Sequence, residues 1–380
     1  MGWWHFTHSY VRGNWRREKT TAPSLLTKSC HDIDVLLWLL CSPPSYRAAA
    51  AGQSEPPHIP STVSSQGSLQ YFKRSRKPVA AGAATNCLLC PIEDSCKYSA
   101  KRIYVGGNLA GLGAGNKGWP VKIVVPDIES YGTEEAGAKA ILAELARDYD
   151  VTTPDDQVAN RNWFGRCVYE SDNDVCDEQV VSVAIHSLIP FRIFVTVCRI
   201  HPTFPLTQSM QQVTITWDED PLPSSHAATY SGLSDPMGGR GAKTATFHMV
   251  AQTRKICERY TTLYGVDGEI YADSATITVH DFRNGQTTIH RPRFEDLGHG
   301  GGDAGLTRQF VLAVDKVKNY GWTTEKAQKE LVGCTLEEVI RSHAMVFCAE
   351  EARRDRKVVN WADWWADEVE GKLIDTDSMI

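Results

Sequence analysis

The chain has 380 residues, of which 42% are hydrophobic and 23% are charged, a balance typical of a soluble globular protein with one large core or two smaller ones. Its net charge of -6 gives no reason to expect a nucleic-acid-binding surface. The first residues, MGWWHFTHSY, lack the apolar segment of a signal peptide. We therefore expect a cytoplasmic protein whose eleven cysteines are free or metal-bound and do not form a disulfide framework.

One segment, Val180–Ile200, has about the length of a transmembrane helix. His186, Pro190 and Arg192 interrupt its middle, and such groups are costly in the hydrocarbon of a bilayer. We therefore expect a protein that does not span a membrane.

The first predicted element is a helix from Leu25 to Cys41. Pro23 and Ser24 provide its start, and the SPPS sequence that follows ends it. Polar and apolar residues alternate from Thr62 to Phe72, which predicts a strand. A second helix is expected at Thr133–Asp150, with acidic residues near its start and a face of alanine and leucine.

The glycine-rich stretch GLGAGNKG (111–118) has the composition of a phosphate-binding turn. Such a turn must join a strand to a helix whose N-terminus faces the phosphate. Here Trp119 and Pro120 follow, and then VKIVV, a pattern that favours a strand. We therefore expect a surface loop without bound nucleotide, and the chain contains no other dinucleotide fingerprint.

Predicted strands fill the middle of the chain and predicted helices follow. Gly265, Gly268 and Gly285 punctuate the strands and indicate hairpins. The fold class is therefore α+β, an open and mainly antiparallel sheet covered by helices on one face. The strands are RCVYES (166–171), QVTITW (212–217), KTATFHMVAQT (243–253), RYTTLYGVDGEIYAD (259–273) and ATITVHDF (275–282); the helices are LTRQFVLAVDKVKNY (306–320), TLEEVIRSHAMVFCAEEARRD (335–355) and the tryptophan-rich VVNWADWWADE (358–368).

The first helix concentrates ionisable residues near its start. Lys28, His31 and Asp34 are spaced i, i+3, i+6 and so share one face. A lysine, a neutral imidazole and a carboxylate on one face can pass a proton to or from a substrate hydroxyl. The spacing is equally compatible with a polar first turn in solvent.

A cysteine cluster, Cys87-x2-Cys90-x5-Cys96, offers three thiolates in a short loop. A structural zinc ion requires a fourth ligand in a tetrahedral site, for which Cys167 and Cys176 are candidates. Free buried thiols and a disulfide are the alternatives to zinc.

An ordered set of motifs makes the chain similar to the C-terminal domain of the Gfo/Idh/MocA oxidoreductases, in particular to a fungal and bacterial branch with the HSYVRGNWR and K-x-C-H-D-x-D signatures. The resemblance implies a domain like that of glyceraldehyde-3-phosphate dehydrogenase, paired with an N-terminal Rossmann domain. It implies hydride transfer between NAD or NADP and a small-molecule substrate, a sugar or cyclitol. The motifs are GWWHFTHSYVRGNWR (2–16), SLLTKSCHDIDVLLWLL (24–40), NCLLCPIEDSCKYSAKRIY (86–104), RCVYESDNDVCDEQV (166–180) and GHGGGD (298–303).

The resemblance also suggests roles for individual residues. The family's helix at the cleft usually has the pattern D-x-x-x-H-x-x-D, in which His31 matches the catalytic histidine and Asp34 the last acid. Thr27 replaces the first acid, and Lys28 beside it is expected to take over proton transfer or to bind substrate oxygens. Expected substrate-binding residues are Arg12, Asn14, Asp34, Tyr169, Asp172, Asn173 and His299, although Arg12 and Asn14 also fit a packing edge and His299 a flexible linker.

The family's NAD-binding turn and E-K-P motif belong ahead of Met1 and have no replacement here. We expect residues 1–368 to be a substrate and oligomerisation domain with a tail at 369–380, in a chain whose nucleotide domain is missing. Family members often pair through the open sheet face, which suggests a homo-oligomer. The alternative is a non-catalytic protein that binds a sugar or a partner chain.

The segment Val181–Gln212 has no counterpart in the family pattern. Its removal joins DEQV to VTITWDED and restores an acidic loop and a strand. Val-Ser can be encoded by a splice-donor sequence and Gln by the acceptor triplet, so we interpret this segment as a translated retained intron.

Overall fold

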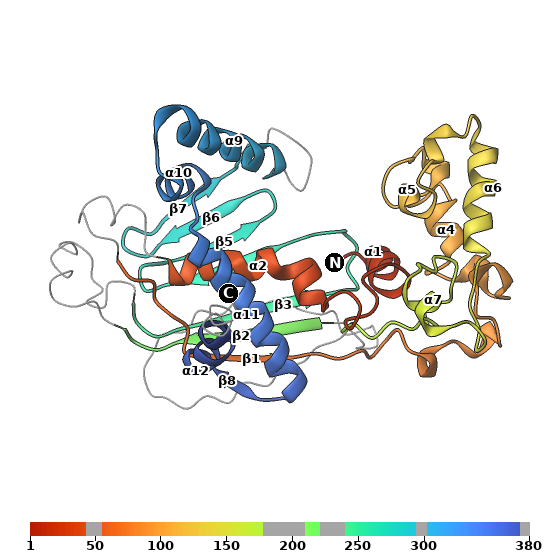
Figure 1. Ribbon diagram of the computed structural model, residues 1–380, viewed down its shortest axis with the longest axis horizontal. Coiled ribbons are helices and arrows are strands. Elements are labelled where there is room, and N and C mark those ends of the chain that lie inside the picture. Colours follow the sequence, from red (N-terminus) through yellow and green to blue (C-terminus); the bar gives the residue numbers. More distant parts are fainter. Residues whose placement is uncertain (43–54, 178–209, 221–239, 294–301, 373–380) are drawn as a thin grey trace, which may run out of the picture.

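The computed structural model describes residues 1–42, 55–177, 210–220, 240–293 and 302–372. It is an α+β protein with two four-stranded antiparallel sheets (Figure 1). The strand order is β3-β2-β1-β8 in the first sheet and β4-β5-β6-β7 in the second. The strands are β1 (Thr62–Gln66), β2 (Met210–Trp217), β3 (Lys243–Val250), β4 (Tyr260–Tyr264), β5 (Gly268–Asp273), β6 (Ile277–Asp281), β7 (Gln286–His290) and β8 (Val358–Asn360).

The helices form two groups. One accompanies the sheets, and the other belongs to a helical lobe, residues 70–177, at the right of Figure 1. The helices are α1 (Trp3–Phe6), α2 (Ser24–Cys41), α4 (Ala100–Tyr104), α5 (Val121–Val124), α6 (Glu134–Leu145), α7 (Asp155–Ala159), α9 (Gly302–Tyr320), α10 (Thr324–Ala327), α11 (Leu336–Asp355) and α12 (Trp361–Trp365), with π-helical turns at Thr7–Arg12, Gln328–Val332 and Ala366–Glu370. Short 3-10 turns lie at Arg74–Arg76, Val79–Ala81, Cys87–Leu89, Glu93–Ser95, Leu112–Ala114 and Ile128–Ser130.

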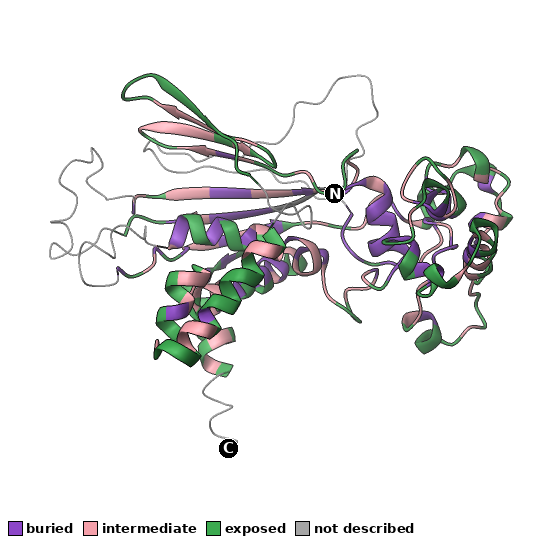
Figure 2. Cartoon of the chain, turned by 90° about the horizontal axis from the view of Figure 1, so that it is seen from above, coloured by how far each residue is buried: buried purple, intermediate pink, exposed green. Residues whose placement is uncertain are grey.

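The first sheet carries its helices on one face. α2 packs on α11, and α11 packs on β1; Figure 2 shows the strands on one side and the helices on the other. Small side chains on α11, among them Ala344, Ala349 and Ala352, are buried and let α2 approach closely. A capping box at Thr335 and Glu338 fixes the start of α11.

The opposite face of the first sheet is polar. Strand register places Thr62 beside Thr216, Ser64 beside Thr214, and Thr214 beside Thr246. The hydroxyls of Thr62 and Thr216 lie 2.6 Å apart. Hydroxyl-bearing residues therefore alternate with core residues along each strand, as a sheet with one buried face requires.

The N-terminal segment, residues 1–13, connects the first sheet to the helical lobe. The amides of Gly2 and Trp3 donate to the carbonyls of Ile256 and Thr253 at 2.9 and 3.0 Å, beyond the end of β3. The following residues are buried, with Trp4 in one core cluster of the lobe and Phe6 in another. The segment is therefore an internal element of the structure, as its purple colour in Figure 2 indicates.

Two features of the sheets differ from the predicted single sheet. The strands divide between two sheets, and β8 was not expected within the tryptophan-rich segment 358–368. β8 forms because Val359, paired with Val63 of β1, is buried in the core. The predicted boundary at residue 368 falls inside the π-helical turn Ala366–Glu370.

The predicted strand over Thr62–Phe72 is correct only as far as Gln66. Beyond it, the carboxylate of Asp177 accepts the backbone N–H groups of Gln70, Tyr71 and Phe72 at 2.5, 2.9 and 2.7 Å. These amides are then not available to a sheet, so the strand ends.

Two other predicted strands are wrong. In RCVYES the amide of Glu170 donates to the carbonyl of Cys167 in a turn, and Arg166 makes only an isolated bridge with Asn86. VKIVV contains the helical turn α5, in which Val121 and Val124 are buried. The helix predicted to reach Asp150 ends at Leu145.

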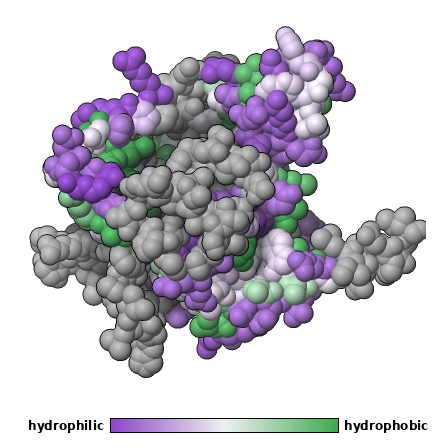
Figure 3. Space-filling view, turned by 90° about the vertical axis from the view of Figure 1, so that its left-hand side faces the viewer, coloured by the Kyte–Doolittle hydropathy of each residue, from purple (hydrophilic) through white to green (hydrophobic). Residues whose placement is uncertain are grey.

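The second sheet and α9 expose apolar side chains. On the sheet these are Tyr260, Tyr271, Ile277 and Ile289, and on α9 they are Leu306, Phe310, Val311, Leu312, Val314 and Tyr320. At the end of the molecule shown in Figure 3, hydrophobic areas lie among more extensive hydrophilic ones.

The predicted insertion Val181–Gln212 lies mostly outside the described residues. Its last residues, Met210 to Gln212, belong to β2 and pair with β3. The predicted membrane-length segment Val180–Ile200 is also outside. Among the described residues, no helix has both the length and the apolar character needed to cross a bilayer.

The contact of α2 with α11 gives a test of the core. Leu37 is 3% exposed, whereas Leu39 on the same helix is 41% exposed. We expect Leu37→Ala to lower the free energy of unfolding by about 2–5 kcal/mol, because it leaves a cavity. Leu39→Ala should cost less than about 1 kcal/mol. Urea denaturation measures both, and equal losses would contradict this packing.

Candidate functional site

The start of α2 presents a polar cluster to solvent, formed by Lys28, His31 and Asp32 together with Cys257 and Arg259. Lys28 Nζ donates to Cys257 Sγ at 3.0 Å. Arg259 Nε donates to Asp32 Oδ1 at 2.7 Å, and Arg259 Nη2 donates to His31 Nε2. His31 Nε2 also lies 3.5 Å from Asp32 Oδ2. We call these five residues the α2 cluster.

Two groups of opposite charge lie at the Nε2 atom of the His31 ring, the guanidinium of Arg259 and the carboxylate of Asp32. A guanidinium has only donors, so a neutral ring that accepts from Arg259 at Nε2 carries its proton on Nδ1. The His31 side chain is 51% exposed, and so a solute can reach it. The opposite face of α2, with Ile33 and Leu37, is fixed in the core. The ring is therefore a solvent-accessible imidazole on a rigid support.

The carboxylate placed beside His31 is that of Asp32, which the spacing argument left out. Asp34 is exposed. Burial of the Cys334 thiol raises its pKa, and the nearby carboxylates of Glu338 and Asp34 raise it further. The hydroxyl of Thr27, which stands where the family pattern has an acid, donates to the carbonyl of Pro23 at 3.2 Å.

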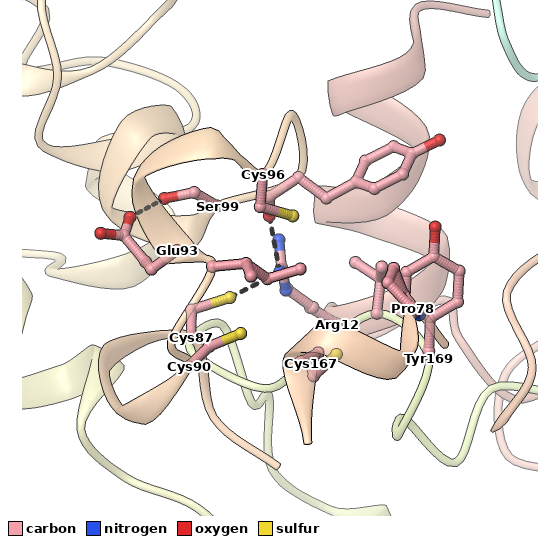
Figure 4. Close-up of a pocket in the computed structure, with 13 residues that line it drawn as sticks. Arg12, Pro78, Cys87, Cys90, Glu93, Cys96, Ser99, Cys167 and Tyr169 are labelled. Atoms are coloured by element: carbon pink, nitrogen blue, oxygen red, sulfur yellow. Dashed lines mark hydrogen bonds between the residues drawn. The ribbon is translucent and has the colours of Figure 1, made fainter. Parts of the chain in front are cut away.

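Arg12 and Tyr169 lie at a different place, the thiol hollow, a cavity of about 30 Å³ in the helical lobe (Figure 4). The cysteines Cys87, Cys90, Cys96 and Cys167 also line it. Arg12 is 0% exposed. A sugar site is about 300 Å³ or more, so this cavity is too small for the substrate predicted for Arg12 and Tyr169.

Arg12 reaches into the thiol hollow with all its contacts internal. Its Nε donates to the carbonyl of Arg166 at 2.7 Å, and its Nη2 to the carbonyl of Tyr98 at 2.8 Å and to Cys87 Sγ at 3.2 Å. Its Nη1 has no hydrogen-bond partner among the described residues. No described carboxylate forms an ion pair with it.

Local backbone geometry brings the thiols together. The amide of Cys87 donates to Gly165 at 2.7 Å, and the amide of Cys167 donates to Thr85 at 2.8 Å, which aligns the two loops. Gly165 is required there, because a Cβ atom would lie 1.7 Å from the carbonyl oxygen of Leu145. Successive turns, in which residues 90, 93 and 96 each donate to the carbonyl three positions earlier, then carry Cys90 and Cys96 to the same hollow.

The thiols of Cys96 and Cys167 have similar surroundings. Burial raises the pKa of both, and the nearby Cys87 sulfur raises it further. A backbone amide donates to each sulfur and lowers the pKa of that thiol. The amide is that of Tyr98 for Cys96 and that of Tyr169 for Cys167.

The remaining predicted substrate residues do not gather around His31. Asp172 accepts from Arg16 Nε at 2.7 Å and lies 3.6 Å from Arg17. Asn173 is buried, and both atoms of its amide lack a partner among the described residues. Asn14 is exposed. His299 lies outside the described residues.

Sequence reasoning missed Arg259 and Cys257 of the α2 cluster. Both precede β4 and are far from α2 along the chain, so no local spacing connects them with His31. Of the two candidates for a fourth thiol, Cys167 lines the hollow, whereas Cys176 lies 3.8 Å from Glu18.

A larger hollow of about 520 Å³ lies between β1 and the end of α11, lined by Ser64, Gln66, Gln70, Arg353 and Lys357 among others. Two of its three lining cations are already paired, and the third is Arg356. Arg353 contacts Glu350 at 2.7 Å and Glu18 at 2.8 Å, and Lys357 contacts Glu351 at 2.8 Å. The hollow therefore offers hydroxyls and amides more than free charge.

Comparisons with known protein families, curated proteins and solved structures found no match for this chain. As placed, no group of three or more His, Cys, Asp or Glu side chains among the described residues could hold a metal ion. The loop 111–118 follows α4 and precedes α5, so it does not join a strand to a helix.

Two buried histidines, His5 and His8, belong to the N-terminal segment. His8 Nδ1 is 2.8 Å from the Tyr104 hydroxyl, and its ring stacks on Phe164. His5 packs edge-on against Trp119. Burial lowers the pKa of each to about 3, with smaller contributions from nearby positive charge.

These histidines predict an acid dependence of stability. Their pKa in the folded chain is below the unfolded value of 6.5, so their contribution is full above pH 6.5 and is lost as the pH falls toward 3. Each should cost about 1.4 kcal/mol per pH unit in this range. His8→Phe, which keeps the stacking, should reduce the slope by about 1.4 kcal/mol per pH unit. Urea denaturation at a series of pH values measures it, and an unchanged slope would argue against buried neutral His8.

Proposed function

We propose that this chain is the substrate domain of an NAD(P)-dependent oxidoreductase of Gfo/Idh/MocA type, acting on a hydroxyl or carbonyl group of a sugar or cyclitol. The observation that carries the proposal is the accessible His31 ring, with Nε2 in contact with Arg259, on a helix fixed in the core. The α+β fold class and the motif resemblance support the same assignment.

In this proposal His31 moves the proton. A substrate hydroxyl takes the place of Arg259 as donor to Nε2, and the imidazole accepts its proton as the carbonyl forms. Lys28 and Arg259 are the cations of the α2 cluster, and they stabilise the negative charge that develops on the substrate oxygen. Asp32, which pairs with Arg259, limits the positive charge around the ring.

The hydride acceptor does not fit the described residues. A dinucleotide needs a strand, a glycine turn and a helix N-terminus in succession, and the described part of the chain has no such arrangement. The proposal for this chain is therefore limited to substrate binding and proton transfer, and hydride transfer belongs to the nucleotide domain that the resemblance implies.

Substrate binding by the chain itself is the first test. Saturation-transfer NMR with a panel of hexoses and cyclitols should detect at least one ligand. His31→Ala should weaken its binding about tenfold, through the loss of one hydrogen bond. His343→Ala, at an exposed histidine of α11, is the control and should bind normally. If no polyol binds, the substrate class is wrong.

Turnover is the second test. In a protein that joins this chain to a nucleotide domain, His31→Ala should lower kcat by roughly two to four orders of magnitude. If His31→Ala leaves turnover unchanged in a protein that binds a polyol, His31 takes no part in the chemistry. Binding without any turnover is the result expected of the non-catalytic alternative.

The predicted homo-oligomer also stays a proposal, and the second sheet supports it. Register places Tyr271 beside Thr278, and Thr278 beside Ile289, on one face. Tyr271 and Ile289 are exposed there, as large apolar residues are at contact surfaces. A second copy of the chain would cover this face.

A further inference from the structure

We propose that Cys87, Cys90, Cys96 and Cys167 bind one Zn²⁺ ion in a tetrahedral thiolate site at the thiol hollow. This site is separate from the α2 cluster and does not depend on the proposed oxidoreductase function. Its role is structural, because four protein ligands leave no open position for a substrate.

The first support is convergence from separate parts of the chain. Cys87 and Cys90 lie on one turn, Cys96 follows a second turn, and Cys167 comes from a loop about seventy residues later. Four thiols that line one small hollow offer the number and type of ligands that a single zinc ion takes. Figure 4 shows the sulfur atoms around the Arg12 guanidinium.

The four thiols line one hollow, and binding of a common ion requires their side chains to rotate. As placed they do not form a metal cluster. A cysteine has a single χ1 torsion with three staggered positions, so each sulfur can turn without a change in the backbone. All four are free thiols in the structure. The hollow of about 30 Å³ has the scale of a single ion or water molecule.

The second support is the unbalanced charge of Arg12. A fully buried guanidinium without an anionic partner is costly. Glu93 lines the same hollow, but its carboxylate contacts Ser99 and Lys101. A zinc ion with four thiolates carries a net charge of about −2, so it supplies the anion that Arg12 lacks. Arg12 Nη2 already donates to Cys87 Sγ, and the unpartnered Nη1 is available for another sulfur.

The third support is the set of donors to sulfur. The amides of Tyr98 and Tyr169 donate to Cys96 and Cys167, and Arg12 donates to Cys87. Such donors favour the thiolate and orient it, as partners of metal ligands commonly do. An all-sulfur tetrahedral set selects zinc or iron. Zinc is the assignment here because a hollow of about 30 Å³ has room for a single ion and not for an iron–sulfur cluster.

The experiment is metal analysis of the full chain with two matched variants. The chain is purified without chelators, and its zinc and iron contents are measured by mass spectrometry. We expect about one zinc ion per chain. Cys167→Ser should lose the ion, whereas Cys176→Ser, at the other candidate thiol, should keep it. Chelation should lower the melting temperature of the wild type but not that of Cys167→Ser.

A measurement on the wild type guards against variants that do not fold. Replacement of zinc by Co²⁺ should give sulfur-to-cobalt charge-transfer bands with the intensity of four thiolates. Weaker bands, or metal retained in Cys167→Ser, would overturn the ligand set. Iron in place of zinc, no metal with every thiol reactive toward Ellman's reagent, or a disulfide between two of the cysteines would overturn the zinc assignment.

Discussion

The burial of the N-terminal segment is the constraint on which the rest of the structure depends. Residues 1–3 are hydrogen-bonded beyond β3, and residues 4–13 fill the interior of the helical lobe. The same ten residues thus contribute to two core clusters and deliver Arg12 to the thiol hollow. Buried backbone N–H and C=O groups must find hydrogen-bond partners inside the protein. A change in this segment should therefore affect both the end of β3 and the helical lobe.

Two sites of different kinds follow from this arrangement. The α2 cluster is half exposed, rich in charge and supported by a helix whose other face is core. The thiol hollow is small and built from loops. An exposed acid–base group can exchange protons with a bound solute, whereas a sulfur cluster suits an ion that holds loops together. Under our two proposals, the first site carries the chemistry and the second stabilises the fold.

The sequence predicted elements where a local pattern decides the structure. α2 and the hairpins between β4 and β6 have strong periodicity or glycine turns, and they form as expected. The last part of the predicted strand 62–72 did not form, because the Asp177 carboxylate accepts hydrogen bonds from backbone amides there. The predicted strand 166–171 did not form, because residues 167–170 make a hydrogen-bonded turn. The candidate site shows the same limit: His31 could be chosen by pattern, but Arg259 reaches it only through the tertiary fold.

The anchoring of Asp177 has a further consequence. Its carboxylate accepts hydrogen bonds from the amides of residues 70–72. The last residue of the helical lobe therefore lies beside the first residues of the lobe. The entropy of closing a loop rises only slowly with its length. A chain that leaves from such a closed point can therefore gain or lose tens of residues before β2 at small thermodynamic cost, and related proteins can differ widely in length there without any change in the lobe.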